Sequence, residues 1–281
     1  MKTSNYRFYI YRYQILPIDR HNQGLLFSSI EELLEKKNEK LQTILTSFDK
    51  ISDSDSDIII KSLYRDDDSF LYKFAVNRSI VLETQSFTKD KLPNWPSFLV
   101  YFWNDSDKQY LIIEDRKKAY QKSDTIVNSI EKYLSSKLKS ELLTIRFESL
   151  FDEEDFWHII EKYKGRLREI NFELITPNMA NISGVLSDDL KEFAFSTNTT
   201  KTQVSIVSDV ESSLAISNRN EMIGSLVKYS SEGGGKITMK VKDLHSKIQT
   251  SKTKKHFEIG EIEISGLTPE VIVQLIKGFL Q

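Results

Sequence analysis

Alternating apolar and polar positions in the first half of the chain predict strands. Residues Tyr6 to Ile15 alternate in this way, and Pro17 ends the run because proline cannot donate a ladder hydrogen bond. Three β-rich runs follow, IIIKSLY, FLYKFAV and SIVLETQ, separated by the turn-like sequences RDDDS and NR. We expect these runs to form an antiparallel meander. PSFLVYFW and QYLIIED, joined by NDSDK, predict a further hairpin.

Apolar residues at helical spacing predict helices between and after these strands. One helix begins near Ser28, which has capping-box spacing to Glu31, and another runs from Ser123 to Lys139. DEEDFWHIIEKYKG predicts a short helix with acidic residues in its first turn and Gly165 just past its end. The other predicted helices start at Asp188, Ser217 and Thr268, and the other predicted strands are Leu167 to Ile175, Thr202 to Ser208, Lys236 to Lys242 and Phe257 to Ile264.

Together these elements predict an α+β fold of two lobes, each a mostly antiparallel sheet with helices packed on it. The 281 residues suffice for two cores, because domains most often contain roughly 100–150 residues. We place the division near residue 140, so that an N-terminal α+β lobe spans 1–140 and a C-terminal α+β lobe spans 141–281. The second lobe is expected to carry a lysine-rich hairpin made from its last two strands.

Composition is that of an ordinary globular protein. Hydrophobic residues make up 39% and charged residues 28%, and no apolar run approaches the ~20 residues that cross a bilayer. The N-terminal segment alternates aromatic and basic residues where a signal peptide would be uniformly apolar. Without cysteine the chain has no disulfide, thiolate zinc site or cysteine nucleophile. We therefore expect a cytoplasmic protein without a membrane span.

Recognised catalytic motifs are absent from the sequence. EGGGK lacks the spacing of a phosphate-binding loop, and we interpret its glycines as a flexible turn. The four histidines are scattered, and SDSDSD lacks the glycine and distal glutamate of a calcium loop. One loose resemblance to metal-dependent nucleases, which use carboxylates and a lysine, is found at Asp105, Asp107, Glu114 and Lys117. A metal-dependent nuclease therefore remains an alternative function. We expect no catalytic residue, metal or cofactor. We therefore expect that the protein is not an enzyme.

The clearest functional signal is a run of lysines from Lys236 to His256. This segment contains seven lysines and one acid, Asp243, so it carries +6 and the rest of the chain carries −8, which gives the net charge of −2. The strand period of two places Lys236, Lys240 and Lys242 on one face. Lysine also protects exposed edge strands from aggregation, so the strand alone fits either a binding face or a solvated edge.

The loop behind this strand favours phosphate binding. Its lysines lie among Ser, Thr and Gln, which suit phosphate oxygens, and the segment has no arginine for bidentate contacts to guanine. We therefore expect sequence-nonspecific binding to nucleic acid. The predicted binding residues are Lys236, Lys240, Lys242, Lys247, Lys252, Lys254 and Lys255, with Gly234 letting the hairpin backbone approach the phosphates. A secondary basic cluster consists of Lys162, Lys164, Arg166 and Arg168. These side chains either extend the binding surface or interact favourably with the dipole at the end of the preceding helix.

The last helix, Thr268 to Gln281, predicts a homodimer. Its apolar residues spread around more of the circumference than a single core face requires, which implies burial on two sides. The second covering surface is either another copy of the chain or another part of the same subunit.

Three segments resemble the RexA-like phage-exclusion proteins: PSFLVYFW, the opening strand FYIYRYQ and the meander DSFLYKFAVNRSIVL. The later order of helices and strands is also similar, and there is a looser resemblance to the KwaB proteins of Kiwa defence systems. The resemblance implies a two-domain α+β protein that dimerises, binds double-stranded DNA without sequence preference and serves phage exclusion or antiphage defence. A second defence-system or phage protein is a further expected partner. The alternatives are a metal-dependent nuclease and a protein-interaction or sensor module without nucleic-acid contact.

Overall fold

The structure is a computed structural model of the chain, and it describes residues 5–19, 30–53, 56–176, 188–260, 264 and 266–280. The chain forms two compact units, each assembled from separate segments. Unit 1 contains Met1–Tyr9, Asn38–Lys137 and His256–Gln281, and unit 2 contains Ile10–Lys37 and Leu138–Lys255. Both units take residues from either side of the predicted division at residue 140, and the domain boundary stays a prediction.

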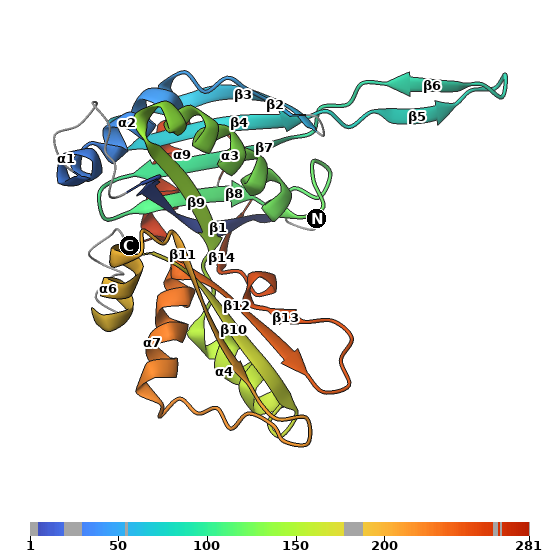
Figure 1. Cartoon of the computed structure of the whole chain (residues 1–281). Helices are drawn as coiled ribbons and strands as arrows, with labels where there is room; N and C mark the ends of the chain where they lie inside the picture. Colours follow the sequence, from blue (N-terminus) through green and yellow to red (C-terminus); the bar gives the residue numbers. More distant parts are fainter. Residues whose placement is uncertain are drawn as a thin grey trace. The chain divides into compact units, whose positions relative to one another are not determined.

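The sheet of unit 1 contains the first five residues of β1 (Asn5–Pro17), whose remaining residues belong to unit 2. Its other strands are β2 (Lys50–Asp53), β3 (Ser56–Arg65), β4 (Ser69–Val76), β7 (Ser97–Asn104), β8 (Gln109–Glu114) and β14 (His256–Gly260). Hydrogen-bonded neighbours follow the order β14-β1-β8-β7-β4-β3-β2 (Figure 1). The predicted pairing of IIIKSLY with FLYKFAV is confirmed as the antiparallel pair β3–β4, and the hairpin of PSFLVYFW and QYLIIED is confirmed as β7–β8.

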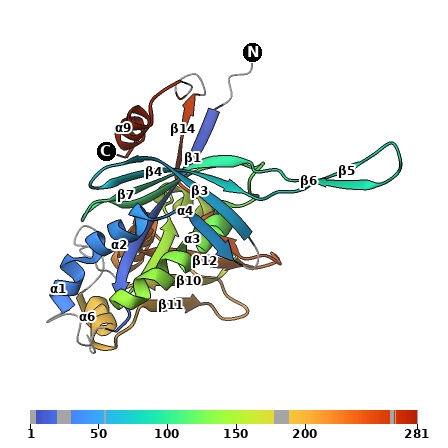
Figure 2. The same cartoon turned by 90° about the horizontal axis from the view of Figure 1, so that it is seen from above.

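Helices cover both faces of this sheet. α2 (Lys37–Thr46) and α3 (Ser123–Leu138) lie on one side and α9 (Pro269–Gly278) lies on the other (Figure 2). The central strand β4 is therefore buried on both faces, which explains its nearly unbroken apolar sequence SFLYKFAV. The helix predicted from Ser28 is divided into α1 (Ile30–Glu35) and α2, and Ser28 itself lies outside the described residues.

Aromatic packing holds α3 to the sheet of unit 1. Phe48 lies between the two layers, and its ring stacks on Tyr133 of α3 with 5.1 Å between the ring centroids. The same ring makes edge contacts with Tyr72, Phe74 and Phe102 of the sheet. Edge-to-face contacts of this kind add to the free energy gained from burial of the rings.

α9 uses most of its apolar surface within unit 1. Ile272, Val273 and Ile276 are buried, and the ring of Phe279 stacks on Phe257 of β14 with 4.8 Å between centroids. Packing within unit 1 therefore accounts for most of the apolar residues that suggested a second covering surface. The homodimer stays a prediction that this helix does not require.

A two-stranded ribbon interrupts the predicted meander. SIVLETQ is predicted as its third strand, but among the described residues β5 (Ile80–Glu83) pairs with β6 (Lys89–Leu92) alone. The ribbon extends away from the sheet of unit 1 (Figures 1 and 2). The prediction is wrong because a run of strand-forming residues does not specify its partner, and β7 takes the place beside β4.

The sheet of unit 2 is built from β11 (Lys201–Val207), β10 (Leu167–Ile175), β12 (Gly235–Val241) and β13 (Ile248–Gln249), in that order. All three pairings are antiparallel. One face packs against α4 (Glu153–Lys162) and α7 (Glu221–Tyr229) around a core that includes Phe156, Phe172 and Met239. The remaining elements of the unit are β9 (Leu143–Ser149), which pairs with the second half of β1, and α6 (Asp188–Ser196).

The predicted lysine-rich hairpin is wrong. β12 pairs with β10 and β13, whereas β14 pairs with β1. β12 therefore forms its local hairpin with β13, whereas β14 pairs with a strand from the other end of the chain. Mixed helix and strand structure with antiparallel sheets is nevertheless confirmed. Every helix within the described ranges is too short or too polar to cross a bilayer.

Candidate nucleic-acid interface

The three glycines at the start of β12, Gly233 to Gly235, are fixed by packing. Gly233 has a φ of 85°, in the left-handed region that favours glycine. A Cβ at Gly234 would overlap the ring of Tyr229, and a Cβ at Gly235 would overlap the carbonyl oxygen of Glu173. The predicted flexible turn is therefore wrong, and so is the predicted phosphate contact at Gly234. Because these residues are buried, their backbone is not open to a ligand.

β12 has one apolar and one polar face, as its sequence predicts. Ile237, Met239 and Val241 are buried in the core of unit 2, while Lys236 and Lys240 lie on the opposite face. The sequence left open whether this strand is a binding face or a solvated edge. On the side away from β10, β13 pairs with Thr238 and Met239 alone, so Lys240 lies beyond the paired residues and the strand keeps part of an open edge there.

Lys236 forms an ion pair within the sheet. Its ammonium lies 3.4 Å from the carboxylate of Glu173 on β10, and Lys201 of β11 forms an ion pair with the same carboxylate. Burial raises the pKa of Glu173, but the hydrogen bond from Lys201 and the charge of Lys236 outweigh burial and lower it overall. Lys236 is therefore a poor candidate for a phosphate contact.

Four predicted lysines are exposed and form no ion pair with any described residue: Lys240, Lys242, Lys247 and Lys252, here called the open lysines. Glu169 lies opposite Lys240 in the strand register, yet their side chains are not paired. The other two predicted lysines are engaged. Lys255 pairs with Asp152 at 3.4 Å, and the ammonium of Lys254 lies 5.4 Å from the ring centroid of Tyr11.

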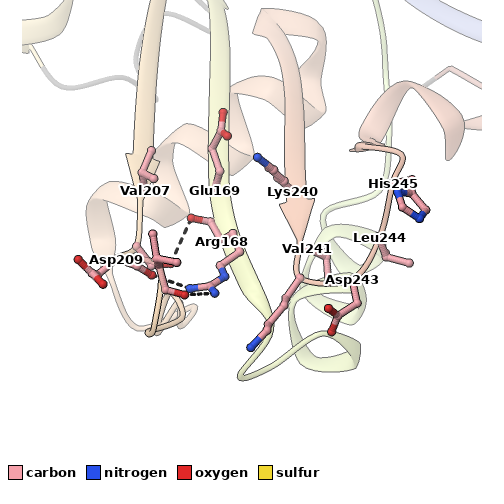
Figure 3. Close-up of a pocket in the computed structure, with 12 residues that line it drawn as sticks. Arg168, Glu169, Val207, Asp209, Lys240, Val241, Asp243, Leu244 and His245 are labelled. Carbon is pink, nitrogen blue, oxygen red and sulfur yellow. Dashed lines mark hydrogen bonds between the residues drawn. The ribbon is translucent and has the colours of Figure 1, made fainter.

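A hollow of about 650 Å³ lies beside the first two open lysines (Figure 3). It is formed where β10 begins and where β11 and β12 end, and both Lys240 and Lys242 contribute to its lining. Apolar side chains, among them Val207 and Leu244, line part of it, and His245 lies on the turn after β12. Three acidic residues, Glu169, Asp209 and Asp243, also line the hollow, so cationic, acidic and apolar side chains meet there.

The secondary basic cluster is engaged inside unit 2. Arg168 donates hydrogen bonds to the backbone carbonyls of Asp209, Val210 and Ser212, and Arg166 donates to the carbonyl oxygen of Lys242 at 3.1 Å. Both arginines therefore hold the loops that border the hollow. At the end of α4, Lys162 has its ammonium 5.5 Å from the ring centroid of Tyr163, and Lys164, just beyond the helix, pairs with Glu161.

The carboxylates of the nuclease alternative do not converge. Asp105 and Asp107 lie in the turn between β7 and β8, where the Asp107 backbone N–H donates to Asp105. Glu114 ends β8, and five strand residues at ~3.3 Å each place it about 17 Å farther along. It accepts a hydrogen bond from the Leu99 N–H, and burial raises its pKa. Within the described ranges no three acidic or histidine side chains are grouped closely enough to hold a metal.

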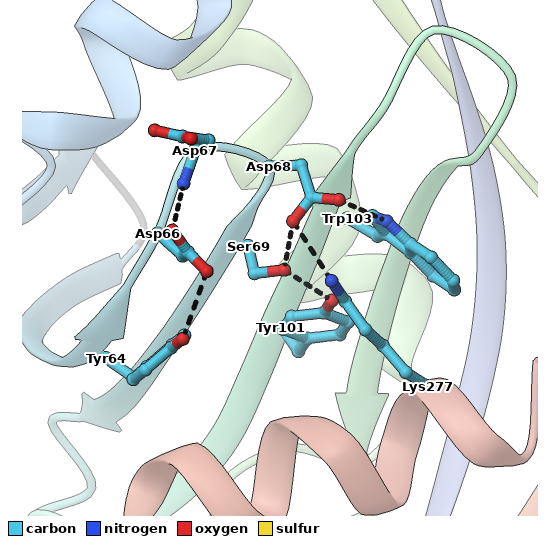
Figure 4. Close-up of polar contacts among 8 residues, drawn as sticks. All are labelled: Tyr64, Asp66, Asp67, Asp68, Ser69, Tyr101, Trp103 and Lys277. Atoms are coloured by element: carbon cyan, nitrogen blue, oxygen red, sulfur yellow. Dashed lines mark hydrogen bonds and ion pairs between the residues drawn. The ribbon is translucent and has the colours of Figure 1, made fainter.

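A second polar network, in unit 1, was not predicted from the sequence (Figure 4). The carboxylate of Asp68 accepts hydrogen bonds from Ser69 at 2.6 Å, from the Trp103 indole at 3.0 Å and from Lys277 at 3.0 Å. The sequence could not reveal this network, because Lys277 is 209 residues from Asp68. These bonds attach α9 to the turn between β3 and β4.

Comparison with models of known protein families gives no match for the chain, and a search of curated proteins finds no significantly similar sequence. The exposure and charge of the open lysines therefore carry the functional interpretation.

Proposed function

We propose that unit 2 binds the phosphate backbone of double-stranded nucleic acid without sequence preference. The observation that carries this proposal is the contrast among the lysines of one segment. Lys236 and Lys255 are paired with acids, whereas the four open lysines are exposed without a partner among the described residues. Unpaired ammonium groups gathered on a short segment attract phosphates and favour release of counterions from duplex.

The surroundings of the open lysines suit backbone contact better than base reading. Ser246 and Ser251 lie in the same segment, and serine hydroxyls are suitable donors to phosphate oxygens. The nearby arginines, Arg166 and Arg168, are bound to backbone carbonyls, so their bidentate forks are not available to guanine. Binding should therefore discriminate little between base sequences.

The cellular setting that we propose is phage exclusion or antiphage defence in the cytoplasm, with duplex DNA as the ligand. Its support is the resemblance of PSFLVYFW, FYIYRYQ and DSFLYKFAVNRSIVL to RexA-like proteins. A two-lobed organisation, a homodimer and contact with a second defence-system or phage protein belong to the same proposal.

Fluorescence anisotropy with labelled duplexes tests this function. Two duplexes of equal length and unrelated sequence should bind with nearly equal affinity. Four phosphate contacts should give a slope of log affinity against log salt of about −3.6 for each subunit. A preference of one sequence over another by more than about tenfold, or a slope near zero, would exclude backbone binding.

A further inference from the structure

A row of three side chains crosses the sheet of unit 2 at the hollow. Glu169 of β10 lies opposite Val207 of β11 on one side and opposite Lys240 of β12 on the other. Residues paired in this way project from the same face of a sheet. Here it is the face turned away from the core, because the next residue along β10, Ile170, is buried in that core. Figure 3 shows the three side chains on adjacent strands, so the hollow has an apolar, an acidic and a cationic residue in that order.

The two ends of this row differ in chemistry. Neighbouring strands lie about 4.8 Å apart, so the backbones at Val207 and Lys240 are about 10 Å apart, with Glu169 midway. Val210, in the loop after β11, adds a second apolar side chain to the lining, and the two valines are 66% and 76% exposed. Lys242, just after β12, adds a second ammonium group. The hollow is therefore apolar on the β11 side and cationic on the β12 side.

Hydrogen bonds fix the two loops that border the hollow. On the β11 side, Arg168 donates to the carbonyl oxygen of Val210 and accepts from the Ser208 N–H at 2.9 Å. On the β12 side, the Lys242 N–H donates to the carbonyl oxygen of Arg166 at 2.8 Å, and the Arg166 side chain donates back to the Lys242 carbonyl at 3.1 Å. A ligand would therefore enter a largely preformed site, which reduces the entropy lost on binding.

Only one of the three acids in the lining is available to a ligand. Asp243 lies 4.0 Å from Arg166, and the Asp209 carboxylate accepts a hydrogen bond from the Glu211 N–H at 3.2 Å. The carboxylate of Glu169 forms no ion pair or hydrogen bond with any residue that the structure describes. It can therefore accept hydrogen bonds from hydroxyl or amino groups of a ligand.

These groups define the chemistry of the ligand. Lys240 and Lys242 suit an anion, Glu169 suits a hydroxyl donor, and the exposed valines suit an apolar ring. A ribonucleotide carries its phosphate, ribose and base in the same order. The volume of about 650 Å³ lies within the range of roughly 300–1,000 Å³ that small-molecule sites occupy. Inorganic phosphate would leave the valines and Glu169 without contacts.

We infer that the hollow of unit 2 binds a ribonucleotide. Its phosphate lies at Lys240 and Lys242, its ribose hydroxyls donate to Glu169, and its base lies against Val207 and Val210. This inference does not rest on duplex binding, because the nucleotide uses only two of the four open lysines and its binding is measured without duplex.

Isothermal titration calorimetry of the full chain with AMP and dAMP tests the inference. The native protein should bind AMP, and it should bind dAMP about tenfold more weakly, because dAMP lacks the 2′-hydroxyl that donates to the carboxylate. Glu169→Ala should abolish this difference between the two nucleotides. The ratio of the two affinities is the readout, since a general loss of folded protein would not change it.

Two double variants of equal charge test the phosphate end of the site. Lys240→Gln with Lys242→Gln should weaken AMP binding by about tenfold or more, because both charged contacts are lost. Lys139→Gln with Lys228→Gln replaces two exposed lysines of the same unit that do not line the hollow, and it should leave AMP affinity nearly unchanged. Both variants should keep the native circular dichroism spectrum, since exposed lysines contribute little to stability.

The inference is overturned if AMP in the millimolar range does not bind, if the native protein binds AMP and dAMP equally, or if the two double variants weaken binding alike. Inorganic phosphate that binds as tightly as AMP would also overturn it, because the hollow would then accept any small anion. None of these outcomes changes the salt dependence of duplex binding, so failure of the nucleotide site and failure of the proposed function are told apart.

Discussion

At Gly234 the space that a side chain would need is already filled by Tyr229. The Tyr229 hydroxyl donates to the carbonyl oxygen of Ile175 at 2.5 Å, so the ring cannot move without breaking a buried hydrogen bond. Gly234→Ala should lower the free energy of unfolding by about 1–3 kcal/mol through overpacking. Urea denaturation measures the change.

Gly224 provides the control for this substitution. It lies in α7, and a Cβ there would meet no atom within 4 Å. Gly224→Ala should raise stability by up to about 1 kcal/mol, because alanine favours helix. Equal stability of the two alanine variants would show that the glycine run is not packed as described.

Asp68 gives unit 1 a dependence on pH. Burial raises the pKa of this carboxyl, but hydrogen bonds from Ser69, Lys277 and Trp103 outweigh burial and lower it below its ordinary value. A lowered folded pKa means that the charged carboxylate stabilises the fold above the unfolded pKa, and that this stabilisation is lost as pH falls through the folded pKa.

Asp68→Asn should therefore destabilise the protein at neutral pH and matter progressively less as pH is lowered. The asparagine cannot form the charged contact with Lys277, and at low pH the native aspartic acid cannot either. Unfolding free energies of both proteins between pH 7 and pH 3 measure the gap. A gap that stays constant across this range would contradict the role assigned to the carboxylate.

Among the elements, α7 shows how a helix start is set by one side chain. The sequence predicts a start at Ser217, but α7 begins at Glu221 because Asn220 is its N-cap and accepts a hydrogen bond from the Ile223 N–H at 3.0 Å. Asn220→Ala should cost about 1 kcal/mol in urea unfolding. Asn220→Asp should keep most of the stability, and a loss as large as that of the alanine variant would argue against the cap.

The local sequence pattern was sufficient to predict those elements whose secondary structure is specified by residues within their own segment. The strand predicted at Leu167 to Ile175 is β10, and the helix predicted from Ser123 is α3, because periodicity and caps lie within the segment. Pairing was not predictable in the same way. Nothing in SIVLETQ specifies that its partner is Lys89–Leu92, and nothing near Lys236 specifies that Glu173 neutralises it. Charge alone therefore marked the candidate segment, whereas the fold was required to separate its exposed lysines from its paired lysines.

On the scale of the whole molecule, an acidic chain must hold its positive charge locally to bind a polyanion. The segment from Lys236 to His256 carries +6 against a net charge of −2. At 0.1 M salt the Debye length is about 10 Å, so acids farther than this from the open lysines are largely screened. Lowering the salt concentration should increase the distance over which these acids repel the phosphates of the duplex. As salt is lowered, affinity for duplex should therefore rise less steeply at very low salt than at moderate salt.

The salt dependence of duplex binding by a quadruple variant tests the central claim most directly. Replacing Lys240, Lys242, Lys247 and Lys252 with glutamine should reduce the slope of log affinity against log salt by about 3.6 for each subunit. The matched control replaces four exposed lysines elsewhere, Lys118, Lys122, Lys139 and Lys228, and has the same net charge.

The account predicts that the control keeps nearly the native slope and that both variants unfold at nearly the native temperature, since exposed lysines contribute little to stability. If the quadruple variant of the open lysines keeps the native slope, or if the control loses as much slope, these lysines do not form a phosphate-binding surface.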